Sequence, residues 1–340
     1  MEHKKVTIKD VAKAAGVSTQ TVSRVANGRP EVAAETREHV QEVIKKLGYQ
    51  PSKIARSLIQ GYSYSLGVIS FGINYYGPSI LLEGIQQAAV KEGYSLMLNI
   101  LPDAEVHEAE TILRGILSYH VDGILWAVPE IGQNRDWIPR AAHEFFVPIV
   151  FLNAQPRPNL LTVISDNKYG GFIATKHLID QGRKNIGIIT GPMDWWEARQ
   201  RELGWREALA RSNRTVDESY ITNGDWSPSS GERSIRMLLE WHPEMDAVFV
   251  CNDQMALGAM KVARHMGRRI PEDLAIVGYD NIPESPYFTP ALTTVRQGIT
   301  EMGRRAVEQL LALINKKEDA TPSSVVLQPT LIIRKSSVNN

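Results

Sequence analysis

The sequence has very little cysteine. Cys251 is the only one in 340 residues, which excludes a disulfide or a thiolate metal cluster within one chain. Because Cys251 ends the apolar run Val248–Cys251, we expect a buried, inert thiol and not a nucleophile. No apolar run reaches the ~20 residues of a membrane span, and the N-terminus lacks the apolar stretch of a signal peptide. We therefore expect a cytoplasmic protein with no membrane partner.

Motifs that nucleotide-dependent enzymes use to bind phosphate are absent as well. No G-x-G-x-x-G follows the first predicted strand, no Walker sequence is present, and no nucleophile–base pair stands out. Asp253 and Asp280 are the candidates for a catalytic base, and an assay for turnover of a bound ligand would reveal such a role. We expect no enzymatic activity, and neither a metal nor a cofactor.

The chain has no excess of either charge, with 38 basic and 38 acidic residues, which by itself argues against a nucleic-acid ligand. The charges are unevenly distributed, however. Residues 1–60 hold 11 of the 38 basic residues and 6 of the 38 acidic ones, so this segment carries +5 and the remainder −5. A basic segment on an acidic body is typical of a protein in which only that segment contacts DNA phosphates.

Residues 7–27 have the pattern of two short helices joined by a tight turn. Thr7 fits the cap of the first helix. Apolar residues then recur at helical spacing, at Ile8, Val11, Ala12 and Ala15. Gly16 suits the left-handed backbone of a sharp turn, and Ser18 fits the cap of a second helix from Thr19 to about Ala26.

The second predicted helix leaves one face available for hydrogen bonds. Val22 and Val25 face the core. The other face carries Thr19, Gln20, Thr21, Ser23, Arg24 and Asn27. In the major groove of DNA, Gln pairs with adenine and Arg with guanine through two hydrogen bonds each. This pattern predicts a recognition helix for double-stranded DNA, although a helical hairpin with a solvated polar face explains the same residues.

A third helix is predicted from Glu35 to Leu47, and a shorter one follows it. In the segment 51–58, Pro51 suits a first helical position, and Ile54, Ala55 and Leu58 share a face. Two turns fall below the ~12–15 residues at which isolated helices become marginally stable. We expect this hinge segment to become helical only against a partner; a flexible linker is the alternative.

From Ser65 onward, strand patterns alternate with helical ones. The predicted strands are Leu66–Phe71, Leu96–Leu101, Gly123–Val128, Ile149–Leu152, Ile186–Thr190, Ala247–Cys251 and Ala275–Gly278. The predicted helices include Ser79–Glu92, Val106–Tyr119, Gly171–Gln181, Arg199–Arg211 and Gln254–Met266. Strands rich in Val and Ile that alternate with helices predict parallel sheets covered on both faces. The strands outnumber those that one such sheet usually needs, so we predict two.

The predicted fold is therefore a small all-α helix-turn-helix head followed by an α/β core of two doubly wound parallel sheets. We expect the head at 1–50 and the hinge at 51–61. The first core subdomain is predicted to comprise 62–161 with 293–321, and the second 162–292 with 322–340.

Polar residues follow the predicted strands, where the ligands of open parallel sheets bind. They are Asn153, Asp166, Asp225, Trp226, Asn252, Asp253, Asp280 and Asn281, together with Arg199 and Arg201. Carboxylates, amides, an arginine and an indole suit the hydroxyls and ring face of a sugar. Individually, Ser79, Asp225 and Asp253 also fit helix caps, Trp226 a core position, and Arg201 an ion pair.

With these residues, the chain resembles the lactose-repressor/galactose-repressor family of bacterial transcriptional regulators over nearly its whole length. The most specific motifs are T-I-K-D-V-A-K-A-A-G-V-S-T-Q-T-V-S-R-V-A-N at 7–27, T-R-E-H-V at 36–40, L-G-Y-Q-P-S at 47–52, N-D-Q-M-A-L-G-A-M at 252–260, V-G-Y-D at 277–280 and L-T-T-V-R-Q at 292–297. The resemblance implies a periplasmic-binding-protein-like core and a homodimer on a near-palindromic operator.

The resemblance also assigns DNA-binding residues. Thr19, Gln20, Ser23 and Arg24 match base-facing positions, Asn27 a groove-edge position, and Leu58 the leucine that wedges into the minor groove. The full predicted set is Thr7, Ser18, Thr19, Gln20, Thr21, Ser23, Arg24, Asn27, Thr36, Ala55 and Leu58. Ala33 departs from the small hydroxyl residue often found at its position, which removes one phosphate contact.

For the effector, the resemblance implies a small neutral sugar or disaccharide held between the two subdomains. The predicted contacts are Tyr75, Ser79, Asn153, Arg201, Trp226, Asn252, Asp280 and Gln297. Asp is common in sugar-binding relatives at the position of Asn153. The aromatic pair Trp195–Trp196 and Tyr75 fit either a second sugar unit or simple packing. After Arg334 no leucine heptads follow, so a dimer is expected. The alternative function is a sugar-binding receptor of a transport system, which would lack residues 1–60.

Overall fold

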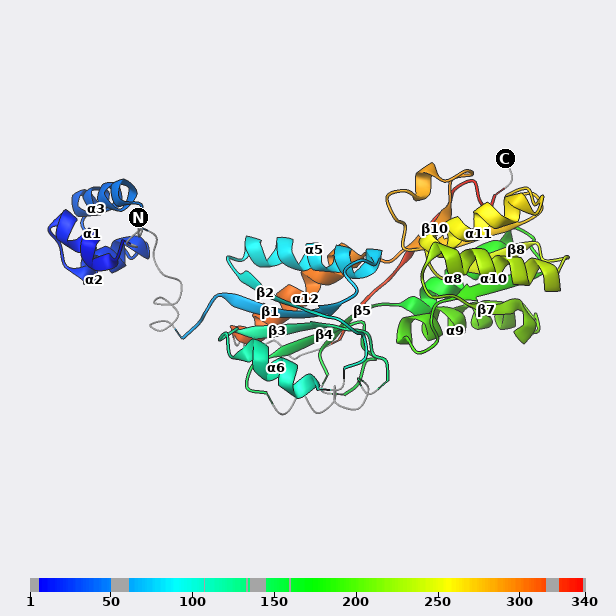
Figure 1. Cartoon of the computed structure of the whole chain (residues 1–340), viewed down its shortest axis with the longest axis horizontal. Coiled ribbons are helices and arrows are strands. Elements are labelled where there is room, and N and C mark those ends of the chain that lie inside the picture. The colour runs from blue at the N-terminus through cyan, green and yellow to red at the C-terminus, as the bar shows by residue number, and fades with distance from the viewer. Residues whose placement is uncertain are drawn as a thin grey trace. The chain divides into compact units, whose positions relative to one another are not determined.

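The computed structural model describes residues 6–49, 61–106, 108–132, 134, 145–158, 160–315 and 324–338 (Figure 1). The chain divides into two compact units, Met1–Tyr64 and Ser65–Asn340. The predicted hinge contacts Ala55 and Leu58 lie outside the described residues. Within the described residues, no helix is both long and apolar enough to cross a membrane.

The N-terminal unit contains the three predicted helices, α1 (Ile8–Ala15), α2 (Thr19–Ala26) and α3 (Ala34–Leu47). Their small core consists of the buried side chains Val11, Ala12, Ala15, Val22, Val25 and Val40. Gly16 ends α1 with a φ of 65°, the left-handed conformation that the sharp turn requires. The predicted helix–turn–helix is therefore confirmed.

The first sheet of the second unit is wholly parallel, with the strand order β11-β5-β4-β3-β1-β2. Its strands are β1 (Ser65–Phe71), β2 (Ser95–Leu101), β3 (Gly123–Ala127), β4 (Ile149–Leu152), β5 (Thr162–Ser165) and β11 (Val325–Leu327). The helices α5 (Tyr76–Lys91) and α12 (Ile299–Ile314) cover one face and α6 (Ala109–Leu117) the other (Figure 1). Accordingly, Leu66 and Val68 of β1 pack with α5 and α12, whereas Ile69 packs with α6.

The second sheet has the order β12-β10-β9-β8-β6-β7. Its strands are β6 (Ile186–Thr190), β7 (Ile221–Asn223), β8 (Ala247–Val250), β9 (Ala275–Tyr279), β10 (Thr293–Arg296) and β12 (Thr330–Ile332). The edge strand β12 runs antiparallel to β10, and the other pairings are parallel. Two doubly wound sheets dominated by parallel pairing agree with the predicted fold class.

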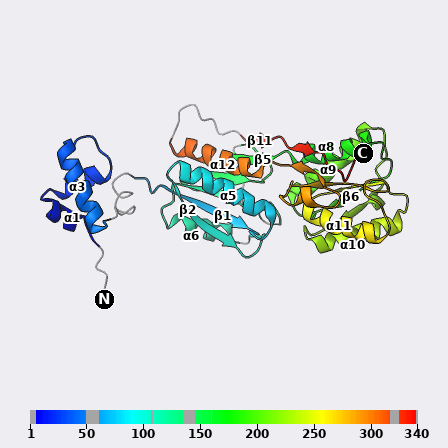
Figure 2. The ribbon, with the colours of Figure 1, turned by 90° about the horizontal axis from the view of Figure 1, so that it is seen from above.

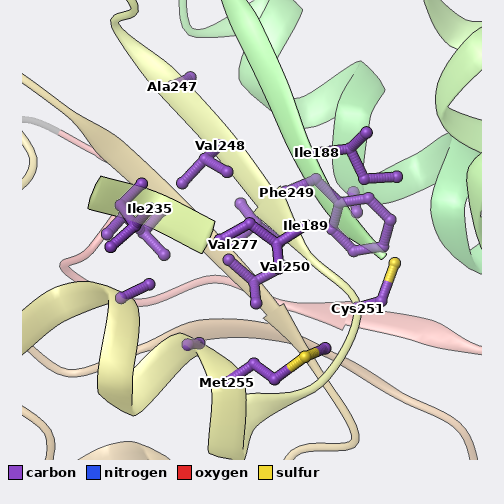
Figure 3. Packing of buried hydrophobic residues seen from close by; sticks show 14 of the residues in the cluster. Ile188, Ile189, Ile235, Ala247, Val248, Phe249, Val250, Cys251, Met255 and Val277 are labelled. Atoms are coloured by element: carbon purple, nitrogen blue, oxygen red, sulfur yellow. The ribbon is translucent and has the colours of Figure 1, made fainter. Parts of the chain in front are cut away.

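Helices pack in pairs on the second sheet. Its helices are α8 (Asn167–Asp180), α9 (Trp196–Arg211), α10 (Pro228–Trp241) and α11 (Asp253–His265), with short 3-10 turns at Glu218–Tyr220 and Ser285–Tyr287. α8 packs on α9, and α10 on α11. Side chains of β8 alternate between the faces: Val248 and Val250 point toward Ile235 and Met255, and Phe249 points away from them (Figure 3).

The chain crosses between the two sheets three times, after β5, after β10 and after β11 (Figure 2). Strand pairing places 162–165 and 325–327 in the first sheet and 293–296 in the second. These boundaries differ by a few residues from the predicted ones, which put each of the three segments in the other subdomain. Each segment is a short strand next to a crossing, and its own sequence does not specify which sheet supplies its partner.

Candidate functional site

The exposed face of α2 carries the residues predicted to contact DNA bases. Val22 and Val25 are buried, whereas Thr19, Gln20, Arg24 and Asn27 are exposed. Ser23 is half-buried and accepts a hydrogen bond from the Asn27 amide at 3.3 Å. Burial of one face fixes the helix to the core, and its opposite face remains free to enter a groove.

Three of the predicted DNA contacts, Thr7, Ser18 and Thr21, also hold the starts of α1 and α2. Ser18 Oγ accepts from the Thr21 backbone N–H at 3.1 Å and lies 2.9 Å from the Thr21 hydroxyl, so the predicted cap of α2 is present. The Thr7 backbone N–H and hydroxyl both donate to Asp10, at 2.8 and 2.7 Å. Thr36 lies half-buried in the first turn of α3.

A pocket lies between the two sheets, where strands of both end. Seven of the eight predicted effector contacts line it, namely Tyr75, Asn153, Arg201, Trp226, Asn252, Asp280 and Gln297. The first sheet contributes residues that follow β1, β3 and β4, and the second contributes residues that follow β6, β7, β8, β9 and β10. The strand order reverses between β1 and β3 in the first sheet and between β6 and β8 in the second, and open α/β sheets bind ligands beyond the strand ends at such a point.

Arg201 is held rigidly on the wall formed by the second sheet. Its side chain donates to Asn167 Oδ1 at 2.9 Å and to the Cys251 carbonyl, and it is 6% exposed. The guanidinium carbon lies 3.8 Å from the centroid of the Tyr279 ring and 5.4 Å from that of Trp226. Stacking and two hydrogen bonds leave this cation little rotational freedom, so it offers a fixed donor to a ligand.

Trp226 and Asn252 form a second fixed group. Asn252 caps α11 by accepting from the Met255 N–H at 2.8 Å, and its amide donates to the Trp226 carbonyl at 3.0 Å. Much of the hydrogen-bonding capacity of Asn252 is thus used within the protein. Trp226 is 8% exposed. Its ring centroid lies 5.8 Å from that of Trp195, and the two indoles meet edge to face. The indole N–H of Trp226 is buried and has no hydrogen-bond partner among the described residues.

Asp280 and Gln297 meet where β9 and β10 end. The Gln297 side chain donates to Asp280 at 2.5 Å. Burial raises the pKa of Asp280 to about 6, against the opposing effect of Arg201. The φ values of Asp280 and Asn153 are 109° and 54°, both in the left-handed region that most side chains avoid.

Several candidates have structural roles instead. Ser79 does not line the pocket, because its hydroxyl donates to the backbone carbonyl of Ile73 beside the start of α5. Asp253 is fully buried and accepts from the hydroxyls of Ser285 and Thr294, each at 2.6 Å. Asp166 caps α8, Asp225 accepts from Ser227, and Arg199 donates to the Met193 and Asp194 carbonyls.

Glu197 is the main pocket residue that the sequence interpretation missed. It lines the pocket from the first turn of α9, and its side chain is 6% exposed. Burial raises its pKa to about 7, against the effects of its own backbone N–H and of Arg201. Its spacing of four residues from Arg201, which places both on one helical face, was the available signal. Tyr76 and Gln254 were also missed.

Comparisons with known proteins agree with this architecture. Residues 7–52 match the family described as "Bacterial regulatory proteins, lacI family", and residues 175–337 match "Periplasmic binding protein-like domain". The HTH-type transcriptional repressor PurR of Haemophilus influenzae (strain PittEE) is 38% identical over 334 residues, covering 97% of this chain and 98% of the relative. PurR of Pasteurella multocida (strain Pm70) is 37% identical over 333 residues, with the same coverage of 97% and 98%.

Solved structures are similar over the whole chain. The lac repressor dimer bound to operator and the anti-inducer ONPF has a TM-score of 0.90 and 31% identity, covering 99% of this chain and 100% of that one. The complex of the transcriptional regulator CelR with cellobiose has a TM-score of 0.72 and 32% identity, covering 98% and 100%. The chain therefore belongs to the lacI family of bacterial regulatory proteins, as a DNA-binding transcriptional repressor that responds to a small molecule and not as an enzyme.

Proposed function

We propose that a small neutral sugar or disaccharide binds in the pocket and controls the affinity of this repressor for its operator. The observation that carries the proposal is the convergence of Asn153, Asp280 and Gln297 with the fixed Arg201 beside the indole of Trp226. Paired donors and acceptors suit hydroxyl groups, and an aromatic face suits the C–H side of a sugar ring.

The similarity to CelR supports a saccharide, because that regulator was solved in complex with cellobiose. Aromatic rings also continue beyond Trp226. The ring centroid of Phe71 lies 6.4 Å from that of Trp195 and 6.4 Å from that of Tyr75, so aromatic rings from both sheets lie near the pocket. A second sugar unit would find a further stacking surface there.

We infer that the sugar acts through the segment 51–58. We predict that in a homodimer on DNA two copies of this segment become helical and stabilise each other only if the cores hold a suitable separation. A sugar that closes the pocket changes that separation, and the helices then lose their partner. Couplings of this kind are typically ~1–3 kcal/mol, a several-fold to hundred-fold change in operator affinity. Release of the operator is the expected direction, and the bacterial cytoplasm is the proposed location.

The alternative function, a sugar receptor of a transport system, does not account for the N-terminal unit. Such a receptor needs no separate three-helix core, and it has no use for a capped helix that exposes Gln20 and Arg24. These features favour the repressor.

Two measurements test the proposal. Calorimetry on the full chain against a panel of mono- and disaccharides should give one with micromolar affinity. Fluorescence anisotropy with a duplex selected from a randomised pool should then show that this saccharide lowers duplex affinity. A nucleobase that binds while every saccharide fails would refute the sugar. A bound saccharide that leaves duplex affinity unchanged would refute the coupling.

A further inference from the structure

The carboxylate of Glu197 has an unusual environment for an acid at the start of a helix. Glu197 is the second residue of α9, a position where acidic side chains are usually exposed and favoured by the helix dipole. Here the side chain is 94% buried and lines the pocket. Its Oε2 atom has no hydrogen-bond partner among the described residues. Helix stabilisation alone therefore does not explain why this acid is buried.

The other carboxylates near Glu197 already have partners. Asp280 accepts from Gln297. Glu130, which lies beyond β3 and is also buried, accepts from the Gln155 N–H at 2.7 Å and from the guanidinium of Arg157. A buried oxygen without a donor is costly, so a ligand that brings a donor to Glu197 relieves that cost on binding.

The charges of the pocket set a second condition on the ligand. Glu197 and Asp280 are its two carboxyl groups, and Arg201 is its one guanidinium among the described lining residues. Arg201 already donates to Asn167 and the Cys251 carbonyl, and it stacks on Tyr279. A phosphate or carboxylate on the ligand would face two acids and a cation whose hydrogen bonds are partly used.

We propose that Glu197 determines effector specificity by accepting a hydrogen bond from a ligand hydroxyl and by rejecting sugars that carry a phosphate or a carboxylate. This inference rests on the proposed function and adds the residue that selects a neutral sugar over an anionic one. Trp226 lines the same pocket, and its buried indole N–H has no partner among the described residues. The pocket wall thus holds an unused acceptor and an unused donor, which suits a ligand with several hydroxyl groups.

Protonation of Glu197 should make the affinity for the sugar depend on pH. Burial raises its pKa to about 7, with Glu130 acting in the same direction and with Arg201 and Arg199 opposing. A ligand donor prefers the ionised carboxylate, so affinity for a neutral sugar should rise as the pH increases from 6 to 8. Asp280, whose pKa burial raises to about 6, also titrates in the lower part of that range, and the comparison with a Glu197 variant separates the two contributions.

The test is calorimetry on the full chain with glucose, galactose, cellobiose and maltose, and with glucose 6-phosphate and glucuronate as anionic counterparts. Glu197→Gln keeps the shape of the side chain and removes its charge. Glu207→Gln is the matched control: it makes the same change on α9, where Glu207 pairs with Lys168 away from the pocket. Thermal unfolding of all three proteins verifies their folding.

The wild-type chain should bind a neutral saccharide and prefer it to both anions. Glu197→Gln should weaken that binding about tenfold at pH 8, flatten its pH dependence and narrow the preference over anions, since hydrogen bonds to charged groups are the strong ones. Glu207→Gln should match the wild type. Unchanged affinity and preference in folded Glu197→Gln would overturn the inference while leaving the sugar effector in place. A wild-type preference for glucose 6-phosphate would overturn the inference and also the neutral character of the proposed sugar. Failure of all six compounds with the wild type would overturn the proposed function itself.

Discussion

The fully buried carboxyl group of Asp253 should make the stability of the core fall as the pH rises through the acidic range. Burial and the nearby Asp280 raise its pKa from 3.8 to about 7, although three hydrogen-bond donors oppose the shift. Between these values the folded chain holds a proton that the unfolded chain has lost. The free energy of unfolding therefore decreases by about 1.4 kcal/mol per pH unit. Over the whole interval Asp253 contributes a loss of about 4 kcal/mol.

Asp253→Asn removes this proton and keeps the shape of the side chain. Its amide can donate to the hydroxyl of Ser285 or Thr294, since a hydroxyl also accepts. We expect the free energy of unfolding of the variant, relative to the wild type, to increase by about 4 kcal/mol between pH 4 and 7. Glu197 and His177 also titrate, but their contributions largely cancel in this difference, whereas the repulsion between Asp280 and Asp253 is part of the measured effect.

Urea unfolding followed by tryptophan fluorescence measures the effect, because all seven tryptophans lie beyond residue 65 and report on the second unit alone. Asp180→Asn, an exposed change on α8, is the control and should show no such pH-dependent difference. A difference that stays constant between pH 4 and 7 would show that the three donors keep Asp253 ionised. The reasoning from burial would then be refuted.

Three further changes have separate outcomes. Arg24→Ala should cost ~1–3 kcal/mol at one operator position and relax base preference there, as measured by binding to single-base duplex variants; unchanged preference would count against the recognition helix. Leu58→Gly should weaken operator binding but not saccharide binding, and equal loss of both in anisotropy and calorimetry would contradict the hinge. Trp226→Ala should abolish the heat of saccharide binding and lower the free energy of unfolding by ~3–5 kcal/mol, whereas Trp226→Phe should retain most stability. Retained affinity in the alanine variant would remove Trp226 from the site.

Local signals in the sequence predict the N-terminal unit well. Ser18 is the cap that its residue type suggests, and Gly16 adopts the left-handed turn, because both features depend on a few adjacent residues. Apolar runs likewise locate seven strands of the core to within a residue or two, but they miss the short strands β5, β7, β10, β11 and β12. Sheet membership of 162–165 and 325–327 depends on contacts between distant segments, and periodicity carries no information about those.

The pocket is predictable as a location more than as a set of hydrogen bonds. Position after a strand identifies Arg201 and Asp280 as neighbours, and the family resemblance adds Gln297. Neither shows that Asn252 uses its amide on Trp226. Ser79 is an apparent candidate whose hydroxyl bonds locally. Glu197 resembles an ordinary acid in a first helical turn, and only its burial distinguishes it.

The positive φ values at Asn153, Trp226 and Asp280 restrict how the ligand preference of this repressor can be redesigned. Valine, isoleucine or threonine at those three positions would strain the main chain, so a combinatorial library that randomises them would contain many destabilised clones. Tyr75, Glu197 and Gln254 have extended or helical backbone and line the same pocket. A biosensor programme for new inducers should therefore diversify these three codons first.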